Sequence, residues 1–176
     1  ANPGKLNFAS FGTGTSSHVY AEAFAKAAGI EAVHVPYKGT ADAARDLLEG
    51  RGQAYFDAAP TAIQNSKTGK IRMIGVASPG RNPAIPDVPT ISEQGVPGID
   101  LTSWIAIVGP VGMAPDLVAK VNALLTQALL SPQVKEFVAR GAYEVSPSTP
   151  AELAADIRSA YDKWGAMIKQ IGFVKQ

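Results

Sequence analysis

Short strand-like runs alternate with helix-like runs over the first hundred residues of this 176-residue chain. The strand-like runs are rich in β-branched and aromatic residues and lie at residues 5–10, 32–37, 53–57, 71–78 and 101–108. The helix-like runs between the first four of them lie at residues 16–28, 40–48 and 61–66. Parallel strands need such crossover helices, so the alternation predicts βαβ units and an α/β fold with a mostly parallel sheet.

Helix start and stop residues support these boundaries. Gly29 and Gly50 follow the first two helix-like runs, as glycine commonly does at the end of a helix. Thr40 is a candidate N-cap for the second of these helices. The stretch Thr90-Ile-Ser-Glu93 matches a capping box and predicts one more short helix.

The pattern changes after Gly109, where the chain becomes mostly helical, with one candidate short strand at residues 143–145. The change at Gly109-Pro110 is therefore a candidate boundary between residues 1–108 and residues 109–176. Three further helices are expected, and their start signals are Pro115, Ser131-Pro132 and Thr149-Pro150-Ala-Glu152.

The composition excludes several classes of protein. The absence of cysteine excludes disulfides, thiolate nucleophiles and cysteine-based zinc sites. The net charge of +1 creates no general field for nucleic acid or for an anionic membrane surface, so we expect no nucleic-acid partner. No run of about 18 apolar residues predicts a membrane-spanning helix.

Three loops at the carboxyl ends of the expected strands are candidates for a binding site, because ligands of open parallel sheets bind at that edge. They are residues 11–16, 38–40 and 57–61, and each leads directly into a helix. Free N–H groups at a helix N-terminus favour an anion, and glycines allow it to approach the backbone closely. These loops predict a site for a small oxyanion, most simply a carboxylate, with Asp57 available to a ligand amine or hydroxyl.

Each of these features also has an interpretation without a ligand. Ser16 and Thr40 can act as helix N-caps, and Asp57 can cap the helix that follows it. The Gly12-Thr-Gly14 stretch lacks the third glycine and the acidic residue of a dinucleotide-binding fingerprint. Nucleotide binding is therefore not expected.

The sequence gives little support to catalysis. His18, in a first helical turn, and His34, inside a strand, are expected to be structural, and two histidines so placed predict no metal site. Lys38 is a candidate Schiff-base lysine, but beside Gly39 and Thr40 a charge partner for a ligand is the simpler interpretation. The chain contains neither a GxSxG nucleophile motif nor a Walker motif. We expect no catalytic residue, no metal and no cofactor.

Several motifs follow one another along the chain. They are Asn7-Phe-Ala-Ser-Phe-Gly-Thr-Gly-Thr-Ser-Ser-His18, His34-Val-Pro-Tyr-Lys-Gly39, Phe56-Asp57, Gly69-Lys70-Ile71-Arg72, Asp87-Val-Pro-Thr-Ile-Ser-Glu93 and Ser103-Trp104. In content and order they resemble the tripartite tricarboxylate transporter receptors, also called Bug-type solute receptors. The resemblance covers essentially the whole chain.

The resemblance implies a type II periplasmic-binding-protein fold, in which two lobes close around a ligand. Residues 1–108 would form the complete second lobe, a mostly parallel sheet with helices on both faces. Residues 109–176 would supply C-terminal helices of the first lobe. The family's N-terminal α/β segment is missing from this sequence, so we expect a fragment, a half held by a second chain, or a dimer.

The resemblance also implies a non-enzymatic periplasmic receptor that captures a small carboxylate for a membrane permease. Family ligands are di- and tricarboxylates, acidic amino acids or aromatic acids. An effector-binding domain of a regulator and, less favoured, an enzyme acting on a carboxylate are the alternatives. The expected ligand-binding residues are Gly12, Thr13, Gly14, Thr15, Ser16, Tyr37, Lys38, Gly39, Thr40 and Asp57.

Overall fold

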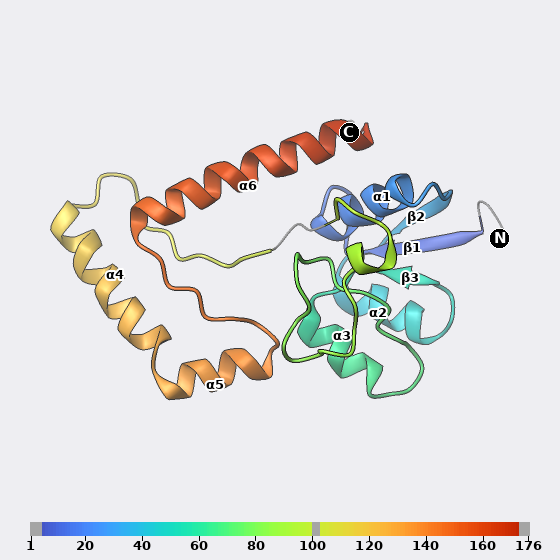
Figure 1. Cartoon of the computed structure of the whole chain (residues 1–176), viewed down its shortest axis with the longest axis horizontal. Coiled ribbons are helices and arrows are strands. Elements are labelled where there is room, and N and C mark those ends of the chain that lie inside the picture. The colour runs from blue at the N-terminus through green and yellow to red at the C-terminus, as the bar shows by residue number, and fades with distance from the viewer. Residues whose placement is uncertain (1–4, 100–102, 173–176) are drawn as a thin grey trace.

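The computed structural model describes residues 5–99 and 103–172, and its N-terminal part is built on three strands (Figure 1). They are β1 (Leu6–Ser10), β2 (Ala32–Pro36) and β3 (Ala54–Tyr55), and they form one sheet in the order β2-β1-β3. Both pairings are parallel, and Phe8 of the central strand lies opposite His34 on one side and Ala54 on the other. The predicted parallel α/β arrangement is confirmed for these strands.

Helices cover both faces of this sheet. The chain crosses from β1 to β2 through α1 (Ser16–Ala27) and returns from β2 to β3 through α2 (Thr40–Leu48), before α3 (Ala59–Ser66). The two crossovers run in opposite directions across the sheet, so right-handed connections place α1 and α2 on opposite faces. Figure 1 shows them on opposite sides of the strands.

The apolar core lies between α1, the last turns of α6 (Pro150–Ile171) and the segment at residues 91–99. The Tyr20 ring stacks on Phe56 with centroids 5.6 Å apart and meets the edge of Trp164 at 5.5 Å. These contacts fix α1 against the sheet and so position its first turn beside the loop after β1. The buried residues of this cluster are Val19, Tyr20, Ala23, Ile91, Ile99 and Met167.

The prediction of a fourth strand at residues 71–78 is wrong. This segment makes one isolated parallel bridge, between Val76 and Thr90, and Ile74 is exposed. An apolar run becomes a strand only where a neighbouring backbone can pair with it, and residues 71–75 have no such neighbour in the described chain. The same holds for residues 103–108, where Ile105 is 87% exposed, while residues 101 and 102 lie outside the described part.

The capping boxes form as predicted, but only one of them starts a long helix. Around Thr90 and Glu93 the two reciprocal hydrogen bonds are present at 2.6 and 3.0 Å, yet the helix is a single 3₁₀ turn, η1 (Ser92–Gln94). The box formed by Thr149 and Glu152 begins the 22-residue α6. By contrast, the N-cap of α2 is Gly39, so the prediction of Thr40 as N-cap is wrong.

The C-terminal helices leave most of their apolar side chains uncovered. Helices α4 (Pro115–Leu129) and α5 (Pro132–Arg140) bury no residue, and Leu124 and Phe137 are 58% and 76% exposed. Figure 1 shows α4, α5 and the start of α6 extending away from the sheet, while the end of α6 returns to α1. The candidate strand at residues 143–145 does not form.

Candidate functional site

The three predicted loops leave the sheet at one edge, because all three strands are parallel and end there. The loops that follow β1 and β2 lie side by side. The N–H of Tyr37 donates to the Ser10 carbonyl at 2.9 Å, and a Cβ on Gly12 would lie 3.7 Å from the Tyr37 carbonyl oxygen. The third loop begins after β3, on the other side of β1. The structure therefore brings the loops at residues 11–16, 38–40 and 57–61 to a common edge.

The first loop is folded tightly around the carbonyl of Gly12. The hydroxyl of Thr15 donates to this carbonyl at 2.6 Å, and the N–H of Thr15 donates to it at 3.3 Å. The φ angles of Gly12 and Gly14 are +137° and +78°, a region that glycine enters without strain. Thr13 and Gly14 form the exposed tip of the loop.

Most N–H groups of this loop are already used inside the protein. Phe11 donates to the Ser17 hydroxyl, Gly12 donates to the Ser10 hydroxyl, and Gly14 donates to Nδ1 of His18. Thr15 occupies the N-cap position of α1, but its side chain makes no capping bond. In the described chain the N–H groups of Thr13, Ser16 and Ser17 therefore have no acceptor. Thr13 is exposed and Ser16 is half-buried, so an anion can reach their N–H groups from the surface, whereas Ser17 is 1% exposed and its N–H group lies deeper in the same helix turn. Ser17 was not among the ligand-binding residues predicted from the sequence.

The second loop offers a charged side chain but not the hydroxyl of Tyr37. That hydroxyl donates to Asp46 on α2 at 2.8 Å, and this hydrogen bond raises the pKa of Tyr37. Arg51 also binds Asp46 at 2.6 Å and lowers the pKa of that carboxyl. Lys38 and Thr40 are exposed at the same edge. Ligand contacts from residues 37–40 stay a prediction.

Asp57 holds the start of α3. Its Oδ1 accepts hydrogen bonds from the N–H of Ala58 at 2.8 Å and from the hydroxyl of Thr61 at 2.6 Å. Burial raises the pKa of Asp57, while these two hydrogen bonds oppose the rise. The nearby Tyr55 hydroxyl is buried, and burial together with the charge of Asp57 raises its pKa. Asp57 thus has a structural role at this edge, and its contact with a ligand stays a prediction.

Two histidines meet beneath the first loop, an arrangement that the sequence analysis missed. The rings of His18 on α1 and His34 on β2 stack with centroids 3.5 Å apart and planes 7° apart. Nε2 of His34 lies 2.6 Å from the hydroxyl of Ser10, which is fully buried. Burial, and next the charge of His18, lower the pKa of His34 to about 4. Only the βαβ crossover brings these two side chains together, since they are 16 residues apart in the sequence.

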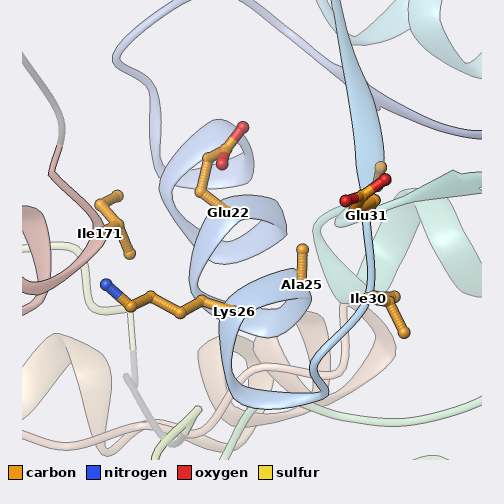
Figure 2. Close-up of a pocket in the computed structure, with 7 residues that line it drawn as sticks. Glu22, Ala25, Lys26, Ile30, Glu31 and Ile171 are labelled. Carbon is orange, nitrogen blue, oxygen red and sulfur yellow. The ribbon is translucent and has the colours of Figure 1, made fainter. Parts of the chain in front are cut away.

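Two shallow depressions lie away from these loops. One is at the far end of α1, toward the start of β2, where the Lys26 side chain reaches toward Ile171 and donates to the Gln170 carbonyl (Figure 2). The other lies between Trp104 and α6. Residues 5–99 and 103–172 contain no group of three or more His, Asp or Glu side chains that could hold a metal. No described helix is long and apolar enough to cross a membrane.

The chain is similar to known proteins along nearly its whole length. Residues 1–173 match the model of the tripartite tricarboxylate transporter family receptor. The chain is 36% identical over 168 residues to the UPF0065 protein in the tcbD-tcbE intergenic region of Pseudomonas sp. strain P51, a match that covers 95% of this chain and 50% of that protein. The chain spans about half the length of most curated relatives that it matches.

Two similar solved structures contain carboxylates. One is described as R. palustris Rpa4515 with adipate, and it has 29% identity and a TM-score of 0.88 over 97% of this chain and 57% of that chain. The other, MatC from Rhodopseudomonas palustris with bound malate, has 27% identity and a TM-score of 0.80 over 94% of this chain and 57% of that chain. Both of these solved proteins are longer than this chain.

Proposed function

We propose, from the premise that the chain belongs to the tripartite tricarboxylate transporter receptor family, that it is part of a periplasmic receptor that binds a small carboxylate. The receptor would deliver this carboxylate to the membrane permease of a tripartite uptake system. The adipate and malate in the two similar structures support the ligand class. The function is capture and release of the acid, without chemical change to it.

The observation that carries this proposal is the set of N–H groups at the start of α1. Ser16 and Ser17 present first-turn N–H groups without acceptors in the described chain, and Thr13 adds a third donor from the exposed tip of the loop. The helix dipole adds about half a positive charge at this end. A carboxylate carries two acceptor oxygens, so it fits several such donors at once.

The second and third loops favour a ligand that carries, besides one carboxylate, a further negative or polar group. Lys38 is exposed at the same sheet edge and can pair with a second carboxylate. Asp57 on the third loop suits an amine or hydroxyl of the ligand, since its Oδ2 accepts no hydrogen bond in the described chain. Dicarboxylates, hydroxy acids and acidic amino acids are therefore the preferred classes.

We also propose that residues 1–108 and 109–176 belong to different lobes of the receptor. The support is the uncovered apolar surface of the second part, where Leu124, Phe137 and Tyr161 are 58%, 76% and 78% exposed. The additional length of most relatives supplies the material that would cover such a surface. The second chain that the sequence suggested as a cover finds no support among the relatives.

Calorimetric titration of the chain with adipate, malate, citrate, glutamate and benzoate tests the proposed function. Adipamide, the uncharged diamide of adipate, is the matched control for the charge. We expect saturable binding of at least one acid, no binding of adipamide, and recovery of the acid unchanged by NMR. Equal binding of the acid and its amide would contradict the anion site, and conversion of the acid would favour an enzyme.

A further inference from the structure

We propose that His18 and His34 act as positioning residues for the first loop, and that carboxylate affinity falls when this pair is protonated. The inference rests on the proposed function, because it concerns the same loop at residues 11–16. It goes beyond that function by assigning a role to two side chains that need not touch the ligand.

The two rings hold the loop at two points. Nδ1 of His18 accepts the N–H of Gly14 at 3.1 Å. Nε2 of His34 lies 2.6 Å from the Ser10 hydroxyl, which is 3.2 Å from both the N–H and the carbonyl oxygen of Gly12. Since the rings stack at 3.5 Å, the position of one ring restricts the other. Both glycines of the loop are thereby connected to one stacked pair of rings.

The hydrogen bond from Gly14 determines which ring nitrogen of neutral His18 carries the proton. An N–H group can donate only to an unprotonated ring nitrogen, so the ring proton of neutral His18 lies on Nε2. Nε2 in turn lies 3.6 Å from the carboxylate of Glu22. Protonation of Nδ1 would set two donors against each other and would release Gly14.

Within the described residues, the charged groups on the elements packed around the pair are the following. Glu22 is the acidic neighbour on α1, β1 contributes the uncharged Ser10, and β2 contributes only His34 itself. Lys38 follows β2 but is exposed. The charged residues near the end of α6, the helix that packs on α1, are also exposed; they are Asp162, Lys163 and Lys169.

Two stacked rings at this distance cannot both carry a positive charge without strong repulsion. Burial and the charge of His18 already hold the pKa of His34 at about 4. A proton on Nδ1 of His18 would cost this ring its hydrogen bond from Gly14. The loop then loses the arrangement in which Gly14 donates inward while Thr13, Ser16 and Ser17 keep their N–H groups for the anion.

Two substitutions of His18 separate its acceptor from its ring. His18→Phe keeps a ring that can stack on His34 but has no acceptor for Gly14, whereas His18→Asn keeps an acceptor near the Nδ1 position and loses the ring. Calorimetric titration with adipate and malate is done on the full chain and both variants at pH 7.5 and pH 5.5, and circular dichroism confirms folding.

We expect His18→Phe to weaken binding about tenfold at pH 7.5, as for the loss of one orienting hydrogen bond, and His18→Asn to restore most of it. The wild-type affinity falls between pH 7.5 and 5.5, and that of His18→Phe changes less. Unchanged affinity in folded His18→Phe overturns the proposal, as does an equal loss in both variants.

NMR of the unliganded chain keeps the inference separate from the proposed function. Nitrogen-15 shifts of the His18 ring should show a proton on Nε2 only, and the Gly14 amide should exchange with solvent faster in His18→Phe than in the wild type. If the wild type binds none of the acids, the proposed function fails. The positioning of the loop is then upheld by faster Gly14 exchange and overturned by unchanged exchange.

Discussion

The Ser10 hydroxyl connects the candidate loop at residues 11–16 to the histidine pair. Ser10→Ala removes this connection and should therefore lower the stability of the folded chain. The hydroxyl is fully buried, lies 2.6 Å from His34 Nε2 and is 3.2 Å from the N–H and carbonyl of Gly12. A hydrogen bond contributes about 1 kcal/mol net, and a buried group left unpaired costs about 1–3 kcal/mol. Because Gly12 and His34 are only half-buried and can reach water, we expect a loss of about 2 kcal/mol in the free energy of unfolding.

Urea unfolding followed by circular dichroism measures this loss as a lower midpoint at an unchanged slope. Ser78→Ala is the matched control, because the Ser78 hydroxyl donates to the Gly80 carbonyl at 2.6 Å in an exposed loop. We expect the control to change stability by less than about 0.5 kcal/mol. If Ser10→Ala costs no more than Ser78→Ala, the Ser10 hydroxyl does not tie the loop to the histidine pair.

Two further predictions concern the same loop. Gly12→Ala should lower the free energy of unfolding by roughly 1–3 kcal/mol, because an alanine would be strained at the φ of +137°. The new Cβ would make only ordinary contacts at 3.5 and 3.7 Å, so the strain comes from the backbone alone. Gly39→Ala is the control and should cost little, since Gly39 has an extended φ of 174° and a Cβ there would meet nothing within 4 Å. Equal urea midpoints for the two variants would contradict this. For pH, the folded chain keeps His34 neutral down to about 4 while the unfolded chain protonates near 6.5, so protons favour the unfolded state between these values. The free energy of unfolding should therefore fall by about 1–2 kcal/mol as the pH drops from 6.5 to 4, a figure reduced because His34 is partly exposed to solvent. In His34→Phe this contribution to the pH dependence should be absent.

The local elements of the fold could be predicted because their signals are local. Gly29 and Gly50 adopt the left-handed conformation that ends the first two helices, and the box at Thr149 and Glu152 begins α6 as expected. The runs at residues 71–78 and 103–108 have the composition of buried strands. Strand formation depends on a distant partner backbone, and composition does not supply that information.

The gathering of the three candidate loops at one edge was predictable, but their internal contacts were not, and ligand binding there stays a prediction. The parallel order of the strands is enough to gather the three loops at one edge. The hydrogen bonds from Tyr37 to Asp46 and from Gly14 to His18 are tertiary contacts that no local pattern in the sequence predicts. His18 and His34 were predicted to have separate structural roles, because stacking between a helix and a strand is likewise a tertiary contact. The N–H groups without an acceptor in the described chain consequently lie at Thr13, Ser16 and Ser17, whereas those of Gly12 and Gly14 are used.

The central claim is that a carboxylate binds at the first turn of α1. A nitrogen-15 NMR titration of the chain with malate, with adipate as the second ligand, tests it most directly. We predict saturable shifts that are largest for the amides of Thr13, Ser16 and Ser17. Shifts concentrated instead around Lys26 and Ile30, in the depression of Figure 2, would contradict the claim.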